Sequence, residues 1–596
     1  MREYSTPATV TVEARSGLAD AVFDNAASHP DSAVFAVRDG DGWTDVTARQ
    51  FADDVAALAG GLLALGLQPG DRVGLMARTR YEWTLVDYAV WTAGCVTVPV
   101  YETSSAEQVE WILGDSGAKA VVVETAAHAG TVASVRDRLP DLAEVLVVDD
   151  GGLDTLRQRG GEIARPAVDA RREAVTADDL ATIIYTSGTT GRPKGCELTH
   201  RNFLFNVGGA ITEMREFFHD SGTTLLFLPL AHVLARYIQV GCVHARVRMG
   251  HAPDTTTLLA DLGSLKPTFL LSVPRVFEKV YNGSKQKAHA GGKGGIFDRA
   301  EAVAIAWSEA QDTGGPGLGL RLQHALFDKL VYGKLRAAMG GNVTHAVSGG
   351  APLGARLGHF YRGIGLVVLE GYGLTETTAP TTTNSPHAVR IGTVGRPIPG
   401  SAVKIADDGE ILLAGDHVFR GYWHNEAATK ESLEPDGWFH SGDLGSLDAD
   451  GYLTITGRKK EIIVTAGGKN VAPAVLEDRL RAHPLVSQCL VVGDQRPFIG
   501  CLVTLDPDAL PAWAERHGKT GTTAAELAED PELRAEIQGA VDEANKAVSQ
   551  AESIRQFRVL PVDFTEAGGQ MTPSLKLKRQ VILAQFADDV DALYRR

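Results

Sequence analysis

The sequence has few cysteines, and they show no metal-binding spacing. Its 596 residues include five cysteines, at positions 95, 196, 242, 489 and 501, with no CxxC pair. A chain of this length with so few cysteines is typical of a cytoplasmic protein with reduced thiols. We therefore expect each cysteine to be a small buried hydrophobic residue.

The chain also lacks an excess of positive charge and a membrane-spanning segment. Its formal net charge of -16 disfavours a nucleic-acid binder and non-specific contact with anionic membranes. The N-terminal stretch MREYSTPATVTVEARSG has no apolar core of a signal peptide. Residues 83–101 are long and apolar, but they contain Asp87, Gly94 and Pro99, which predicts a buried helix and then a strand. Any membrane contact is expected to be peripheral.

The length of the sequence and its pattern of helix and strand signals predict the fold class. A chain of 596 residues exceeds the roughly 250–300 residues of a single core, so at least two domains are expected. Helical and strand patterns alternate over the first 150 residues, which indicates an α/β protein with mostly parallel sheets. Residues 276–340 read as a helical excursion. Short strands between Gly and Asp turns follow residue 400 and predict a β-rich subdomain, and the last 120 residues predict a small α+β domain.

One segment has the form of a phosphate cradle. The apolar run ending at Tyr185 is followed by TSGTTGRPKG, residues 186–195. Glycines let backbone N–H groups face an anion, the hydroxyl side chains add donors, and Lys194 adds a mobile positive charge. Because Gly195 follows the lysine, the segment is not a Walker A motif. A plain Gly/Thr surface loop is the alternative interpretation.

The eleven residues YTSGTTGRPKG resemble the signature loop of the AMP-forming acyl-CoA synthetases, which belong to the adenylate-forming superfamily. Further segments resemble this family in the family's order, over essentially the whole chain. They are SGGAP (348–352), EGYGLTETT (370–378), GWFHSGDLG (437–445), GRKKEIIVTAGGKNVAP (457–473) and TPSLKLKR (572–579). Singly, each could be a turn, a helix end or a solvated strand.

The resemblance implies a role for each matching residue. Glu376 and Thr186 would hold Mg²⁺, Tyr372 would stack on adenine, and Asp443 would bind the ribose with Arg458 nearby. Lys576, Glu376, Thr186 and Lys194 would be the catalytic residues, with Lys576 bridging the attacking carboxylate and the α-phosphate. The implied ATP-binding residues are Thr186, Ser187, Gly188, Thr189, Thr190, Gly191, Lys194, Gly349, Gly350, Ala351, Gly371, Tyr372, Gly373, Thr375, Asp443, Arg458 and Lys576.

The resemblance also implies a mobile C-terminal domain. It predicts an N-terminal adenylation domain over residues 1–457, a hinge over 458–460 with Lys460 as the hinge residue, and a C-terminal domain over 461–596. Gly467 and Gly468 would line the coenzyme A tunnel. His232 matches a position that lines the acyl pocket in the family, and a buried core histidine is the alternative. The lysine motif departs from the family, which usually has Ser-Gly-Lys where this chain has Ser574-Leu575-Lys576.

The reaction implied is activation of a fatty acid by ATP to acyl-AMP, followed by transfer to coenzyme A. VPVYETSSAEQVEWIL (98–113) and GDQRPFIGCLVTLD (493–506) resemble the long-chain branch. ATP, Mg²⁺ and coenzyme A are therefore the expected cofactors and co-substrates, and no nucleic-acid partner is expected. The oligomeric state stays open, a homodimer included. Rival interpretations are a ligase that loads a carrier protein, an amino-acid adenylation protein, a luciferase-like oxygenase and a lipid-binding pseudoenzyme.

Overall fold

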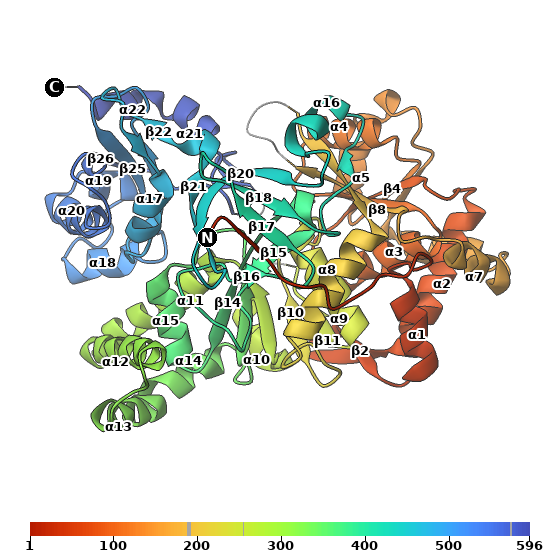
Figure 1. Ribbon diagram of the computed structural model, residues 1–596, viewed down its shortest axis with the longest axis horizontal. Coiled ribbons are helices and arrows are strands. Elements are labelled where there is room, and N and C mark those ends of the chain that lie inside the picture. Colours follow the sequence, from red (N-terminus) through yellow and green to blue (C-terminus); the bar gives the residue numbers. More distant parts are fainter. Residues whose placement is uncertain (187–191, 254–255, 573–574, 596) are drawn as a thin grey trace.

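The fold was analysed in a computed structural model, and the structure describes residues 1–186, 192–253, 256–572 and 575–595. Within these ranges, four sheets and their helices form a large N-terminal domain, which runs from β1 to β21. Two further sheets form a smaller C-terminal domain from β22 to α22 (Figure 1). The predicted fold class, a large α/β domain with mixed sheets and a small C-terminal domain, is confirmed.

A seven-stranded sheet arises from the alternating pattern at the start of the chain. Its strand order is β19-β9-β8-β5-β4-β6-β7, parallel from β8 to β7 and antiparallel at β9 and β19. The strands are β4 (Arg72–Met76), β5 (Val96–Val100), β6 (Ala120–Val123), β7 (Glu144–Val147), β8 (Leu180–Thr186), β9 (Lys194–Thr199) and β19 (Gly421–Tyr422). The accompanying helices are α1 (Asp20–Ser28), α2 (Ala48–Ala64), α3 (Tyr81–Thr92), α4 (Ala106–Ser116), α5 (Ala126–Ala133), α6 (Gly152–Gly160) and α7 (Arg165–Glu173).

Local sequence explains why these helices begin where they do. At α2 the Thr47 hydroxyl accepts from the Gln50 backbone N–H, and the Gln50 side chain accepts from the Thr47 N–H. This reciprocal pair satisfies two backbone donors that no helical carbonyl can reach. Phe51, Val55 and Leu58 then recur at helical spacing and are buried in the main core.

The apolar segment at residues 83–101 is a buried helix and strand, as predicted. Its one acidic residue, Asp87, is fully buried and pairs with the equally buried Arg236. Asp87 also accepts from Thr97 at 2.8 Å and from Gln239 at 3.1 Å. The ion pair and these bonds offset the cost of taking two charges out of water. No helix in the described part of the chain is both long and apolar enough to cross a bilayer.

Two further α/β sheets complete the body of the large domain. One has the order β10-β11-β2-β3 and the other the order β12-β13-β14-β15-β16. Their strands are β2 (Ala33–Asp39), β3 (Gly42–Thr47), β10 (Thr223–Leu226), β11 (Arg248–His251), β12 (Phe269–Ser272), β13 (His345–Ser348), β14 (Val367–Leu374), β15 (Ala379–Thr383) and β16 (Arg396–Pro397). The helices are α8 (His200–Glu213), α9 (Val233–Ala245), α10 (Leu258–Leu265) and α15 (Ala355–Gly363). Because β12, β13 and β14 are parallel, their carboxyl ends lie at one edge.

The predicted helical excursion lies between β12 and β13. It consists of α11 (Pro274–Ala290), α12 (Gly294–Asp312), α13 (Leu318–Phe327), a π-helical turn (Asp328–Tyr332) and α14 (Gly333–Ala338). Figure 1 shows α12 and α13 at the outer edge of the large domain.

The predicted β-rich subdomain is a five-stranded antiparallel sheet with the order β1-β17-β18-β20-β21. Its strands are β1 (Glu3–Ser5), β17 (Ala402–Ile405), β18 (Glu410–Ala414), β20 (Phe439–Leu447) and β21 (Leu453–Arg458), with α16 (Glu426–Ser432) between β19 and β20.

The C-terminal domain has its own cores. Its sheets are β22 (Ile463–Val464) with β23 (Asn470–Val471), and β24 (Val486–Val492), β25 (Ile499–Leu505) and β26 (Ile554–Leu560). Its helices are α17 (Pro473–Arg481), α18 (Leu510–Arg516), α19 (Ala524–Ala528), α20 (Pro531–Asn545), α21 (Arg579–Gln585) and α22 (Ala587–Ala592). All five cysteines of the chain are free and buried, as predicted.

Candidate active site

The signature loop connects two paired strands. Thr186 ends β8, Lys194 begins β9, and the two residues are paired in register. The predicted phosphate-binding residues Ser187, Gly188, Thr189, Thr190 and Gly191 lie outside the described residues. The pairing of the flanking strands fixes both ends of the loop at one place on the sheet.

Glu376 lies beside this hairpin, in the 3₁₀ turn η4 (Thr375–Thr377) that follows β14. The Tyr422 hydroxyl donates to Glu376 Oε1 at 2.8 Å, and Lys194 Nζ lies 5.0 Å from the centre of the Tyr422 ring. Tyr422 therefore connects the predicted phosphate-binding lysine to the predicted metal ligand. Tyr422 was not among the predicted residues, because nothing in its spacing relates it to Glu376.

Thr186 and Glu376 both adjoin the buried Cys196. Thr186 Oγ1 lies 3.9 Å from Cys196 Sγ, and the pKa of Cys196 is raised well above its usual value, first by burial and then by the Glu376 carboxylate. One carboxylate and one hydroxyl are hard oxygen donors, and Mg²⁺ is commonly held by one or two carboxylates together with substrate phosphates. The pair fits such an ion. In the described ranges, no group of three His, Cys, Asp or Glu side chains could hold a metal alone.

Asp443 on β20 joins two other predicted residues, Tyr372 on β14 and Arg458 on β21. The Tyr372 hydroxyl donates to its Oδ2 at 2.6 Å, and Arg458 Nε donates to its Oδ1 at 2.8 Å. Asp443 and Arg458 are register partners, so the sheet itself sets this contact. Burial, and then the Asp443 carboxylate, raise the pKa of Tyr372 well above its usual value. The predicted ribose ligand is thus held in place by both of its oxygens.

The structural reason for glycine differs among the predicted ATP-binding glycines. Gly349, Gly350 and Ala351 follow β13, and Gly350 has φ +84°, a left-handed conformation that favours glycine. Gly373 lies so close to β15 that a Cβ there would be 1.7 Å from the Ala379 carbonyl oxygen. Gly371 is also close, at 3.2 Å from the Thr382 oxygen. The close packing of β14 against β15 is therefore sufficient to explain why residue 373 is a glycine.

Lys576 of the C-terminal domain lies beside these residues of the large domain, and we call the place where Lys576 meets Gly350, Asp443 and Arg458 the cleft. A Cβ on Gly350 would lie 3.8 Å from Lys576 Cε. The pKa of Lys576 is lowered, mainly by desolvation and then by the Arg458 guanidinium, while the Asp443 and Glu376 carboxylates act in the opposite direction. Leu575, at the position where the family usually has glycine, has φ +61°, the conformation that glycine favours.

His232, the predicted acyl-pocket residue, lies at the start of α9. Burial, and then the Lys576 charge, lower the pKa of His232 to about 3, so the imidazole is neutral at physiological pH. Its Nδ1 accepts from the Leu234 backbone N–H at 3.2 Å and caps the start of α9. His232 therefore has a structural role as a helix cap, which the sequence did not predict.

The predicted hinge and tunnel residues follow β21 along the chain. Lys460 lies in the short turn Lys459–Glu461 after β21. Gly467 and Gly468 lie between β22 and β23 and are exposed. A Cβ on Gly468 would meet nothing within 4 Å, and one on Gly467 would approach only Thr465. This arrangement therefore places Lys576, and not the glycine pair, at the cleft.

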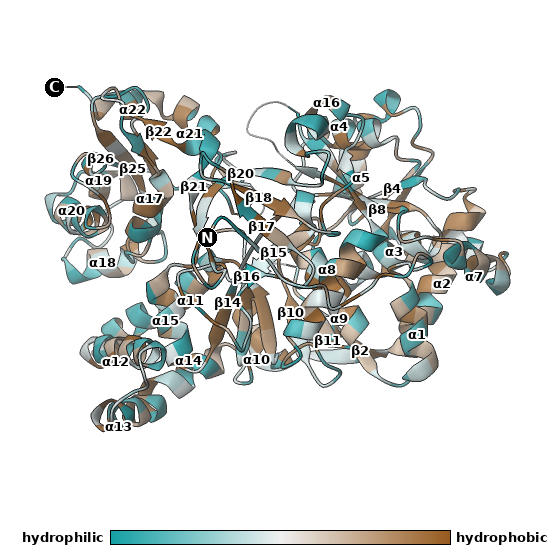
Figure 2. Cartoon of the chain, viewed as in Figure 1, coloured by the Kyte–Doolittle hydropathy of each residue, from teal (hydrophilic) through white to brown (hydrophobic). Residues whose placement is uncertain are grey.

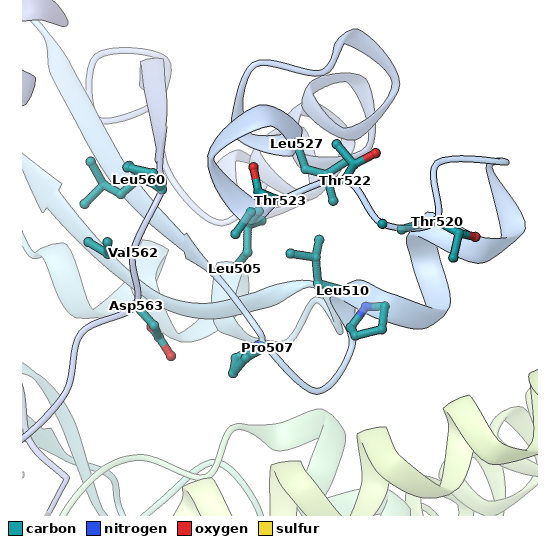
Figure 3. Close-up of a pocket in the computed structure, with 15 residues that line it drawn as sticks. Leu505, Pro507, Leu510, Thr520, Thr522, Thr523, Leu527, Leu560, Val562 and Asp563 are labelled. Atoms are coloured by element: carbon teal, nitrogen blue, oxygen red, sulfur yellow. The ribbon is translucent and has the colours of Figure 1, made fainter.

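A separate pocket of about 510 Å³ lies in the C-terminal domain (Figure 3). It is bounded by α18, α19 and the segment after β26, and Leu505, Leu510, Leu527 and Leu560 contribute apolar walls. None of the predicted site residues lines it.

Models of known protein families match both domains. A model described as AMP-binding enzyme matches residues 22–423, and a model described as AMP-binding enzyme C-terminal domain matches residues 460–596. The chain is also 54% identical over 600 residues to the long-chain-fatty-acid–CoA ligase FadD15 of Mycobacterium bovis, with all of both chains covered.

More distant proteins are similar over nearly the same length. The long-chain-fatty-acid–CoA ligase ACSBG2 of Xenopus laevis is 31% identical, with 95% of this chain and 82% of the relative covered. Among solved structures, the anthranilate CoA ligase AuaEII in complex with anthranoyl-AMP has a TM-score of 0.72 at 19% identity, covering 98% of this chain and 99% of the other. At that identity the likeness shows the fold alone.

Proposed function

Because the chain belongs to the AMP-binding enzyme family over both of its domains, we propose that it is an AMP-forming long-chain fatty-acid–CoA ligase. It activates a fatty carboxylate with ATP to acyl-AMP and then transfers the acyl group to coenzyme A, with AMP and pyrophosphate as the other products. The observation that carries this proposal is the convergence of Lys576 with Asp443, Arg458 and Gly350, contributed by two domains, in one cleft.

In the first half-reaction a carboxylate oxygen attacks the α-phosphorus of ATP, and the bond to the β-phosphate breaks. Two anions approach each other, so positive charge held in place beforehand lowers the barrier. Lys576 would bridge the carboxylate and the α-phosphate, and Lys194 would contact the outer phosphates. Glu376 and Thr186 would hold Mg²⁺, which neutralises phosphate charge when bound. Asp443, fixed by Tyr372 and Arg458, would orient the ribose.

In the second half-reaction the coenzyme A thiol attacks the acyl carbon and AMP leaves. We assign the adenylation domain to residues 1–457, the hinge to 458–460 with Lys460, and the mobile domain to 461–596. The exposure of Gly467 and Gly468 supports this assignment, since a rotation is needed to bring them to the cleft in place of Lys576.

A long-chain substrate is supported by the two relatives described above, both of which are named long-chain-fatty-acid–CoA ligases. The buried, reduced cysteines and the acidic net charge agree with a cytoplasmic enzyme.

The test of substrate and reaction is pyrophosphate release from ATP with fatty acids from acetate to about eighteen carbons, with and without coenzyme A. We expect acyl-CoA to form fastest with the long chains. Retained acyl-AMP without a coenzyme A product would favour the carrier-loading ligase. Pyrophosphate release only with short or aromatic acids would contradict the long-chain assignment.

The test of the site is Lys576→Ala, with Lys578→Ala two residues later as the matched control. Loss of one transition-state donor costs on the order of 10²–10³ in rate, so acyl-AMP formation should fall by that factor in Lys576→Ala alone. Thioester formation from supplied acyl-AMP should be largely retained, because Lys576 serves only the first half-reaction. An equal fall in both half-reactions would contradict the role of Lys576.

A further inference from the structure

The helix α13 carries a stripe of exposed leucines. Leu318, Leu322 and Leu326 follow one another at four-residue spacing and are 79%, 75% and 56% exposed. Leu330, in the π-helical turn that follows, continues the series at 48%. Residues four apart lie on the same side of a helix, so the four side chains form one apolar strip. We call these four residues the leucine stripe.

The other side of α13 and of the turn that follows it anchors this segment to the domain. Phe327 and Val331 pack against the core beneath the helical excursion. His324 stacks on Trp307 of α12 with ring centres 4.0 Å apart, and its Nε2 bonds to the Gly363 carbonyl at 2.7 Å. These contacts hold α13 against the domain, although no residue of the helix is fully buried. Contacts within the domain therefore explain the packed side of this segment, but they do not explain the leucine stripe.

The segment that carries the leucine stripe also carries positive charge. Arg321, Lys329 and Lys334 are exposed and form no ion pair with any described residue. Asp328, the acidic residue of this segment, is already paired with Arg336. In a chain with a net charge of -16, this is a local patch of opposite sign. Figure 1 shows α13 at the outer edge of the large domain, and Figure 2 shows hydrophobic residues along it.

We propose that α13 and its following turn dock this protein onto an anionic lipid bilayer. An interfacial helix inserts apolar side chains among the acyl chains while cationic side chains contact lipid headgroups. Each Lys or Arg close to an anionic surface strengthens the attachment further. The leucine stripe and its three unpaired cations meet both requirements. The acidic net charge disfavours non-specific contact with anionic membranes, and the proposed docking depends instead on this one basic, apolar segment.

A second copy of the chain fits the patch less well. In a two-fold interface the same surface faces itself, so Arg321, Lys329 and Lys334 would oppose their own copies without acidic partners. A stable interface also needs roughly 800 Å² from each partner, contributed by about 20–30 residues. Four leucines on three helical turns supply only a small part of that.

The docking is independent of the proposed reaction, so it is tested without ATP or fatty acid. The purified full-length protein is floated with vesicles of phosphatidylcholine containing about one-quarter phosphatidylglycerol, and with vesicles of phosphatidylcholine alone. The apolar variant is Leu318→Ser, Leu322→Ser, Leu326→Ser. Its matched control is Leu259→Ser, Val562→Ser, Leu583→Ser, three apolar side chains that are also exposed but lie elsewhere.

The charge variant is Arg321→Gln, Lys329→Gln, Lys334→Gln. Its matched control is Arg49→Gln, Lys266→Gln, Arg555→Gln, which removes three exposed cations elsewhere. Thermal unfolding of each variant verifies the fold, and light scattering reports the oligomeric state.

We expect wild-type protein and both controls to bind anionic vesicles at least about tenfold better than neutral ones. The apolar variant should lose binding by tenfold or more, and the charge variant should lose the preference for anionic vesicles. Three results would each overturn the proposal: no binding of the wild type, unchanged binding of the apolar variant, or a wild-type dimer that the apolar variant converts to a monomer. The last result would identify a second copy as the partner of the leucine stripe.

Discussion

Arg275 is the residue whose substitution tests most directly how the C-terminal domain is held over the cleft. It lies in the first turn of α11 in the large domain, and its guanidinium donates to Ser487 Oγ at 3.2 Å and to Asp506 Oδ2 at 3.3 Å in the C-terminal domain. The side chains of Arg275 and Asp506 are only 15% and 9% exposed. We predict that Arg275→Ala weakens the docking that brings Lys576 to the cleft.

The size of the effect follows from the burial of the contact. A hydrogen bond to a charged group contributes about 1.5–3 kcal/mol, and solvent screens this pair little. A loss of about 2 kcal/mol shifts the docking equilibrium by about 30-fold. Acyl-AMP formation should therefore fall by up to about 30-fold, while thioester formation from supplied acyl-AMP should change less than about twofold.

The assay compares ATP–pyrophosphate exchange with coenzyme A thioester formation from supplied acyl-AMP. Lys279→Ala is the matched control, since Lys279 reaches Asp508 across the same contact at 3.8 Å with side chains 60% and 78% exposed. Such an exposed pair contributes little, so this control should behave like the wild type. The reasoning is refuted if both half-reactions fall equally in Arg275→Ala, or if the two substitutions have the same effect.

Three further predictions concern single residues. Burial raises the pKa of Glu370 from 4.5 to about 7, so the folded state loses stability as pH rises across that range. Glu370→Gln should therefore increase the free energy of unfolding by about 1–3 kcal/mol at pH 8 and by less at pH 5, and a pH-independent change in Tm would contradict this. Leu575 has φ +61°, a backbone conformation that glycine adopts easily and a β-branched residue does not. Leu575→Gly should therefore retain acyl-AMP formation, whereas Leu575→Ile should lower its rate about fivefold; equal rates in the two variants would count against backbone strain at residue 575. Tyr422→Phe removes the donor to Glu376 and should raise the Mg²⁺ requirement about tenfold, and an unchanged Mg²⁺ titration would argue against Glu376 as a ligand.

Much of the fold could be predicted because its elements have strong periodicity. The helix Ala48–Ala64 and the helix-then-strand over residues 83–101 both form where the apolar spacing indicates. The site residues were found by resemblance, in segments of distinctive order. Tyr422 was missed, because its role depends on β19 pairing with β9, more than two hundred residues earlier in the chain.

Other contacts could not be predicted from the sequence either, because they too join residues that lie far apart in the chain. The Asp87–Arg236 pair joins α3 to α9, and no local pattern indicates that a lone acidic residue in an apolar helix has a partner. The Arg275–Asp506 contact depends on how two separately folded domains dock. The leucine stripe was read only as part of a helical excursion, since periodicity cannot tell an exposed apolar face from a packed one.

The sequence by itself determined the α/β class, the order of the elements and the family to which the catalytic segments belong, because these depend on local periodicity and on short motifs. Tertiary structure alone decided that Tyr372 and Arg458 hold Asp443. It also decided that Tyr422 connects Lys194 to Glu376. Finally, it placed Lys576 at the cleft and left Gly467 and Gly468 facing solvent. These arrangements join residues from distant parts of the chain, and only packing of sheets and domains sets the distances between them.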